Sequence, residues 1–94
     1  MTVDVAQLVS AGWLAPGARL RNCQMKDEFP AALATVAQDG RLHVDGRAYD
    51  TPSGAAHAYT QRSINGWFWW AVEGTGKSLA DLRSDYLASL GADD

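Results

Sequence analysis

The sequence contains one cysteine and no long hydrophobic run, and both shortages limit what the protein can be. Cys23 alone cannot form an internal disulfide, which fits the reducing cytoplasm. No apolar stretch approaches the roughly 18 residues of a membrane-spanning helix, and the N-terminal residues lack the basic start and apolar run of a signal peptide. With 94 residues we expect one cytoplasmic domain over residues 1–94, with a core at about 3–90 and an acidic tail at 91–94.

Metal-binding and catalytic patterns are also missing. His43, His57 and the cysteine show no zinc-ligand spacing, no G-x-S-x-G motif is present, and no pair of carboxylates stands out. The segment GTGKS at 74–78 resembles the end of a phosphate-binding loop, but Ala71 stands where the first glycine of that motif belongs. We therefore expect a protein that is not an enzyme, with no catalytic residue, no metal and no nucleotide cofactor.

Positive charge is in short supply as well. Eight Lys and Arg stand against eleven Asp and Glu, for a net charge of −3. Because neutralising phosphates supplies most of the non-specific affinity for nucleic acid, this balance argues against a strong non-specific binder. The distribution of the positive charges is more favourable to DNA binding, since five arginines fall in or beside predicted strands and can form a local basic face. These are Arg19, Arg21, Arg41, Arg47 and Arg62.

Turn and capping signals divide the first half of the chain. Asp4 followed by Gln7 predicts the start of a helix, and Gly12 is placed to end it. Strand patterns follow at 18–25 and 31–37. The hairpin signal Asp39-Gly40 then leads into alternating Leu42 and Val44, and a second tight turn at Asp45-Gly46 leads into Arg47–Tyr49.

The second half begins with Thr51 as a helix cap and a proline at the first helical position, for a helix to about residue 60. Asn65-Gly66 is expected to turn the chain into a strand over Trp67–Val72. Ser78, three residues before an aspartate, caps the last helix, which Gly91 ends. The expected order is a helix, a three-stranded antiparallel meander, a helix, a strand and a helix, which is an α+β fold.

Four consecutive aromatic residues occupy positions 67–70. Alternation along a strand would put Trp67 and Trp69 on one face, and Phe68 and Trp70 on the other. Two interpretations remain open: all four rings form core, or Trp67 or Trp69 lines a groove on which a planar base stacks. Asn65 is equally ambiguous, because an Asn side chain can pair with adenine but Asn-Gly is also an ordinary turn.

Several short motifs occur in a fixed order along the chain. They are a G-x-L-x-P-G-like turn at 12–17, the Asp39-Gly40 hairpin, a Ser-Pro-Ser-like helix start at 51–53, and N-G-W-x-x-W at 65–70. Together with LVSAGWLAPGARL and LADLR around them, these segments resemble the RAMA domain, which is named for its association with restriction enzymes and adenine methylases. The resemblance runs from about Val3 to Arg83.

This resemblance implies DNA recognition, of adenine or N6-methyladenine, in a restriction, modification or defence setting. Four residues match the motif by position: Ser53, Asn65, Trp67 and Trp70. The sequence departs from the usual pattern at Thr51, where serine is common, and at Gly54, where alanine is common.

Two hypotheses about the function therefore remain open. The leading hypothesis is a non-enzymatic DNA-binding module, and the alternative is a protein-interaction or adaptor module, including a homodimer, that uses an aromatic surface. Neither involves a membrane. The candidate DNA-binding residues are Arg19, Arg21, Arg41, Arg47, Ser53, Tyr59, Arg62, Ser63, Asn65, Trp67 and Trp70.

Overall fold

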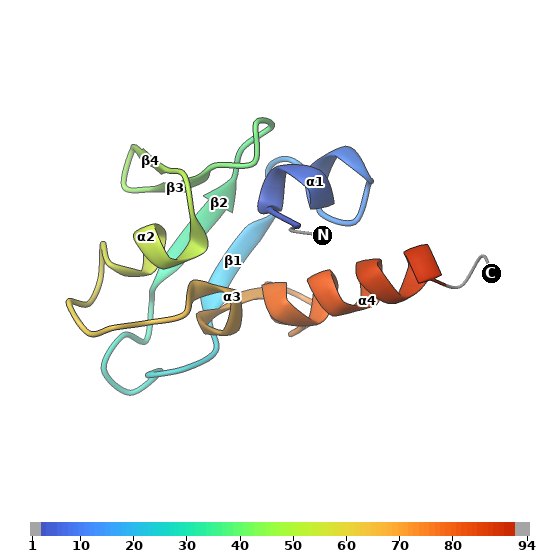
Figure 1. Cartoon of the computed structure of the whole chain (residues 1–94). Coiled ribbons are helices and arrows are strands. Elements are labelled where there is room, and N and C mark those ends of the chain that lie inside the picture. Colours follow the sequence, from blue (N-terminus) through green and yellow to red (C-terminus); the bar gives the residue numbers. More distant parts are fainter. Residues whose placement is uncertain (1–2, 92–94) are drawn as a thin grey trace.

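The domain consists of an antiparallel sheet with helices on one side (Figure 1). A computed structural model describes residues 3–91. The elements in chain order are α1 (Val5–Ser10), β1 (Arg19–Asn22), β2 (Leu33–Val36), β3 (Leu42–Val44), β4 (Arg47–Tyr49), α2 (Pro52–Ala56), α3 (Gly66–Trp69), β5 (Trp70–Val72) and α4 (Leu79–Gly91). The predicted α+β class is confirmed. The described part of the chain contains five strands, one more than predicted, because Arg47–Tyr49 forms a strand of its own.

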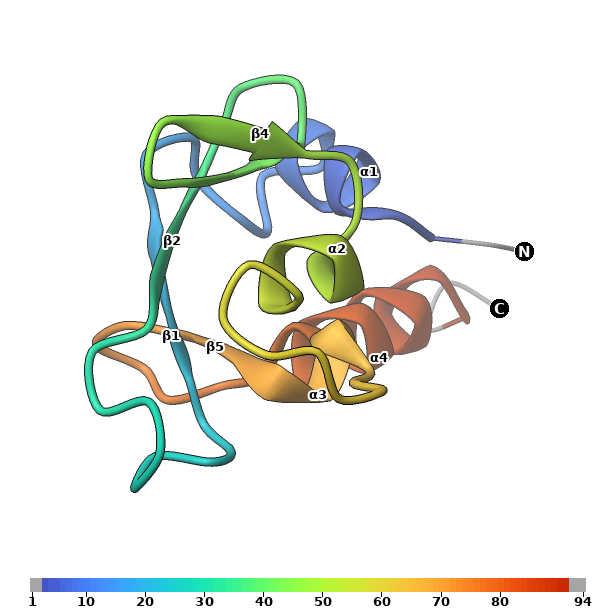
Figure 2. The same ribbon diagram turned by 90° about the vertical axis from the view of Figure 1, so that its left-hand side faces the viewer.

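The strands lie in the order β4-β3-β2-β1-β5. The first four form a meander, and β5 returns to pair with β1, with Leu20 opposite Val72. Along β1 and β2 buried and exposed residues alternate, so that each strand has one inner and one outer face. Figure 2 shows α1, α2 and α4 on one side of β1 and β2. The opposite face of the sheet has no helix over it among residues 3–91.

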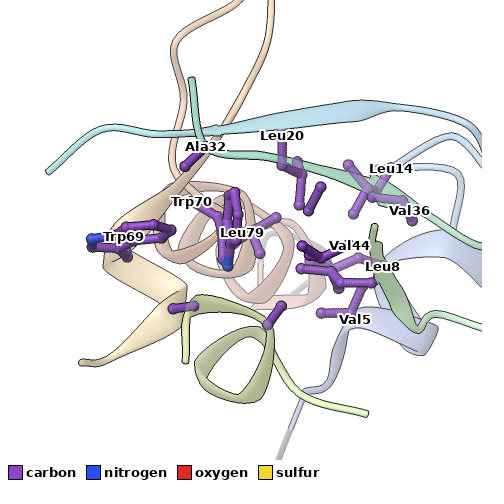
Figure 3. Packing of buried hydrophobic residues seen from close by; sticks show 14 of the residues in the cluster. Val5, Leu8, Leu14, Leu20, Ala32, Val36, Val44, Trp69, Trp70 and Leu79 are labelled. Carbon is purple, nitrogen blue, oxygen red and sulfur yellow. The ribbon is translucent and has the colours of Figure 1, made fainter. Parts of the chain in front are cut away.

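The core fills the space between the inner face of the sheet and the helices (Figure 3). Its largest fully buried side chains come from both layers: Leu8, Leu20, Val36, Leu42, Trp69, Trp70 and Leu79. Fully burying one such side chain stabilises the fold by about 1.5–3 kcal/mol. Of the 13-residue helix α4 only Leu79 is fully buried, and the helix extends away from the sheet (Figure 1).

Most of the predicted helix caps are confirmed. The Asp4 side chain accepts a hydrogen bond from the Gln7 backbone N–H at 2.9 Å, and the Gln7 side chain accepts one from the Asp4 backbone N–H at 3.0 Å. Thr51 also caps α2, by accepting a hydrogen bond from the Gly54 backbone N–H at 3.0 Å, although that helix ends at Ala56 rather than near residue 60. Gly91 is the last residue of α4, and the remainder of the predicted acidic tail, 92–94, lies outside the described residues.

The hairpin predicted at Asp39-Gly40 is also confirmed, and it packs against α1. The backbone of Gly40 has a φ of +88°, and a Cβ there would lie 2.5 Å from the Ala6 Cα. A side chain at this position would therefore be strained and would collide with the first helix.

Within residues 3–91, no helix is long and apolar enough to cross a membrane.

The predicted strand over Trp67–Val72 is wrong in its first half. The Asn65 side chain accepts a hydrogen bond from the Trp67 backbone N–H at 3.1 Å, and the Asn65 carbonyl accepts one from Trp69 N–H at 3.2 Å. These bonds make one helical turn, α3, so that only Trp70–Val72 pairs with β1. The expected alternation of rings is lost: Trp69 and Trp70 are both buried, whereas Phe68 is 50% exposed.

Candidate functional site

The residues of the N-G-W-x-x-W motif join α3 to α2. Gly66 lies so close to α2 that a Cβ there would be 2.1 Å from the Pro52 carbonyl carbon. The Gly66 backbone N–H donates to Ser53 Oγ at 2.9 Å, and Trp70 Nε1–H donates to the Pro52 carbonyl at 3.0 Å. Asn65 caps α3. The structure therefore uses these residues to hold two helices together, and Trp70 is fully buried.

Tyr59 completes the hydrogen bonding of β2. Pairing between β2 and β3 begins at Thr35, so Leu33, the first residue of β2, has no partner in β3. The Tyr59 hydroxyl donates to the Leu33 carbonyl at 2.8 Å and accepts from its backbone N–H at 3.1 Å. The ring itself is half-buried against Trp69 and Trp70. Both polar functions of this side chain are thus engaged within the domain.

Tyr59→Phe is therefore expected to lower the free energy of unfolding by about 1–2 kcal/mol. The substitution keeps the ring in the aromatic cluster and removes only the hydroxyl, so the Leu33 backbone loses both bonds. Urea denaturation followed by tryptophan fluorescence measures the change. Tyr49→Phe is the matched control, since no hydrogen bond of the Tyr49 hydroxyl occurs among residues 3–91; equal losses for both variants would contradict this role of Tyr59.

Trp69 belongs to the core and does not line a groove. It is 0% exposed, and its ring packs against Trp70, Tyr59 and Phe29 with centroid distances of 4.7, 6.1 and 6.3 Å. Its Nε1–H has no hydrogen-bond partner among the described residues. An unsatisfied buried donor costs about 1–3 kcal/mol, which the burial of so large a ring offsets.

Trp67 is the one tryptophan of the motif that is half-buried. The guanidinium carbon of Arg83, on α4, lies 4.3 Å from the centroid of its ring. This cation–π contact covers one face of the indole from within the domain. No sequence pattern predicted this contact, because residues 67 and 83 meet only through the packing of α3 against α4.

The outer face of the sheet brings two of the predicted arginines together. Arg19 lies opposite Thr35, which lies opposite His43, and Arg21 lies opposite Leu33. Directly paired residues share a face of a sheet. All five are exposed, and together we call them the open sheet face.

The other three arginines lie in different surroundings. Arg41 forms ion pairs with Asp39 and Asp50, at 3.8 and 3.0 Å. Arg62, in the loop that also contains exposed Ser63, is paired at 3.1 Å with Glu28 of the β1–β2 loop. Arg47 is exposed on the edge strand β4, opposite Val44.

Because Val44 points into the core, Arg47 lies on the other side of the sheet from Arg19. The structure therefore does not gather the five arginines into one basic face. Arg19 and Arg21 are the pair that it places on adjacent outer positions of one strand.

A cavity of about 470 Å³ lies next to the open sheet face. Arg21 belongs to both, and the cavity continues between the β1–β2 loop and the loop after β5. Its other charged residues are Lys26 and Glu73. Cys23 also lines it, and burial raises the pKa of the Cys23 thiol, although a backbone hydrogen bond and Lys26 act in the opposite direction. The thiol is therefore protonated at neutral pH.

The GTGKS segment forms a turn rather than a phosphate-binding loop. The Val72 backbone N–H donates to the Lys77 carbonyl at 2.8 Å, and the Gly76 N–H donates to the Val72 carbonyl at 2.9 Å. Lys77 forms an ion pair with Asp85 at 3.1 Å. Ser78 caps α4, accepting a hydrogen bond from the Asp81 backbone N–H at 3.0 Å, as predicted.

A family model described as RAMA, Restriction Enzyme Adenine Methylase Associated, matches residues 1–92. The chain belongs to the RAMA family. The family resemblance seen in the sequence is thereby confirmed, and it associates this domain with restriction enzymes and adenine methylases. No curated protein matches the chain.

In this RAMA domain nine of the eleven predicted site residues fall into two groups, to neither of which exposed Ser63 and half-buried Trp67 belong. Ser53, Tyr59, Asn65 and Trp70 hold elements of the fold together. The arginines remain at the surface, and only two of them share the open sheet face. Sequence reasoning missed Lys26 and Glu73, because their approach depends on β5 pairing with β1, and these strands are far apart in the chain: β1 ends at Asn22 and β5 begins at Trp70.

Proposed function

We propose that this RAMA domain is a non-enzymatic, cytoplasmic DNA-binding module that contacts the duplex through the open sheet face. The observation that carries the proposal is the placement of Arg19 and Arg21 on an exposed sheet face with no helix over it in the described part of the chain. The major groove of B-DNA admits strands of a sheet, and Arg contacts either phosphate or the O6 and N7 atoms of guanine there.

The family association supports DNA as the ligand, and adenine or N6-methyladenine as the feature recognised, in a restriction, modification or defence setting. Thr35 and Leu33 offer methyl groups on the open sheet face, and such groups make apolar contact with the methyl group of a base. The net charge of −3 limits the affinity, since only a few phosphates are neutralised.

Fluorescence anisotropy with short duplexes, with and without N6-methyladenine, tests the proposal. The wild type is expected to bind with a log–log salt slope of about −2, because two arginines neutralise two phosphates. Arg19→Ala combined with Arg21→Ala is expected to weaken binding about tenfold or more and to flatten that slope.

Arg47→Ala is the matched control, since Arg47 is also exposed but lies on the other side of the sheet. It is expected to leave affinity within about twofold of the wild type. Equal weakening by the control and the double variant would contradict binding through the open sheet face. Absence of binding to either duplex at low salt would contradict DNA binding altogether.

A protein-interaction module is the second candidate, and one observation favours it. Large apolar side chains are exposed at the end of the molecule formed by α4: Trp13 is 38%, Leu87 39% and Leu90 45% exposed. Trp13 packs edge-on against Tyr86, with ring centroids 6.0 Å apart, which joins the loop after α1 to this helix. A partner bound here would be held by apolar contact, so its affinity should hardly change with salt. Sedimentation equilibrium at low and high salt tests this for a second copy of the chain.

A further inference from the structure

The cavity beside the open sheet face is built from three segments of the chain. The end of β1 contributes Arg21 and Asn22, the β1–β2 loop contributes Cys23, Lys26 and Pro30, and β5 with the following loop contributes residues 71–74 and Gly76. Its volume of about 470 Å³ falls within the range of roughly 300–1,000 Å³ typical of small-molecule sites. The space is therefore large enough for one small organic group.

The charges in this cavity are separated rather than paired. Arg21, Lys26 and Glu73 all line it, yet none of the ion pairs found in residues 3–91 includes any of them. The Arg21 guanidinium donates to the Pro30 carbonyl at 3.3 Å, and its remaining N–H groups are left for another acceptor. A matching ligand carries an anionic group for the two cations and an N–H donor for the carboxylate.

A nucleotide has this combination of groups. Its phosphate suits Arg21 and Lys26, and the exocyclic amino group of adenine, cytosine or guanine can donate to Glu73. Thymine has no exocyclic amino group and is the poorest match. N6-methyladenine keeps one N–H on that nitrogen and remains a donor.

The position of the cavity connects it to the duplex. Arg21 lines the cavity and also belongs to the open sheet face, and the backbone N–H of Glu73 donates to the Arg19 carbonyl at 2.9 Å. A duplex held by Arg19 and Arg21 therefore has the cavity at its side. We infer that the cavity receives one amino-bearing nucleotide turned out of the duplex, with Arg21 and Lys26 on its phosphate and Glu73 on its base; this inference rests on the proposed function.

Short duplexes labelled with fluorescein and containing 2-aminopurine at successive positions test this inference. Anisotropy reports whether the duplex is bound, and 2-aminopurine fluorescence rises when that base leaves the stack. The wild type is expected to raise the fluorescence severalfold at one position. Glu73→Gln and Lys26→Ala are expected to remove most of this rise, about fivefold or more, while anisotropy shows affinity within about threefold of the wild type.

Asp45→Asn and Arg47→Ala are the matched controls, because they make the same charge changes in the β3–β4 hairpin, away from the cavity. Both are expected to leave the fluorescence rise unchanged. Binding without any rise, or a rise that persists in Glu73→Gln and Lys26→Ala, would overturn the inference and leave the proposed function standing. No binding of any duplex would overturn both.

Alkylation of Cys23 gives a second readout that does not depend on fluorescence. Cys23 lines the cavity, so a nucleotide inside it should shield the thiol. We expect saturating duplex to slow modification by iodoacetamide, at about pH 9, by fivefold or more, and Glu73→Gln to abolish this protection. An unchanged rate with bound duplex would contradict occupation of the cavity.

Discussion

Gly66→Ala is expected to destabilise the domain strongly, by about 3 kcal/mol or more. The added Cβ would lie 2.1 Å from the Pro52 carbonyl carbon, 2.3 Å from the Pro52 oxygen and 2.3 Å from the Ser53 nitrogen. All three are backbone atoms, so no side-chain rotation relieves the collision, and α2 must separate from α3. Overpacking of this kind costs about 3 kcal/mol or more, a large part of the roughly 5 kcal/mol that a small domain has.

Urea denaturation followed by tryptophan fluorescence and circular dichroism measures this loss. Gly91→Ala is the matched control, because a Cβ on that helical residue meets nothing within 4 Å. It is expected to leave the free energy of unfolding unchanged or to raise it slightly, as alanine favours helix. A Gly66→Ala variant as stable as the wild type would contradict the close packing of α2 against α3.

Trp70→Ala is expected to lower the free energy of unfolding by about 3–5 kcal/mol. The side chain is fully buried, with its ring 4.7 Å from that of Trp69 and its Nε1–H bonded to the Pro52 carbonyl at 3.0 Å. Removing it leaves a cavity in the core and deletes the hydrogen bond that joins Trp70 to the first turn of α2. Thermal unfolding followed by circular dichroism gives the change.

Phe68→Ala is the control for this prediction. Phe68 lies two residues earlier in the same aromatic run and is 50% exposed, so its loss is expected to cost about 1 kcal/mol or less. Trp70→Phe is expected to fall between the two, since the ring remains but the bond to Pro52 is lost. Similar losses for Phe68→Ala and Trp70→Ala would contradict the inward placement of Trp70.

The sequence was a good guide where one or two residues decide the local backbone. The Asp4 and Thr51 caps, the Ser78 cap of α4 and the turns at Asp39-Gly40 and Asp45-Gly46 form as predicted. At the β3–β4 turn, Asp45 and Gly46 have φ values of 50° and 81°, the left-handed conformations that Asp-Gly tolerates. These signals were enough to establish the α+β class.

The sequence predicted the structure poorly where contacts between distant segments determine the backbone. Four consecutive aromatic residues favour a strand, but the Asn65 cap and the contact of Gly66 with α2 turn three of them into a helix. The candidate site likewise depends on contacts between segments that are far apart in the sequence. One cavity is lined by Arg21, Lys26 and Glu73 only because β5 returns to pair with β1. No local sequence pattern predicts that pairing.

The most direct test of the proposed DNA interface is the ¹⁵N–¹H spectrum of the labelled protein titrated with a short unlabelled duplex. Binding through the open sheet face predicts that the largest shift changes fall on Arg19, Arg21, Leu33, Thr35 and His43. The backbone amides of Trp13, Leu87 and Leu90, at the α4 end, should stay in place. Shift changes concentrated at the α4 end, or a spectrum that the duplex leaves unchanged at low salt, would contradict the account.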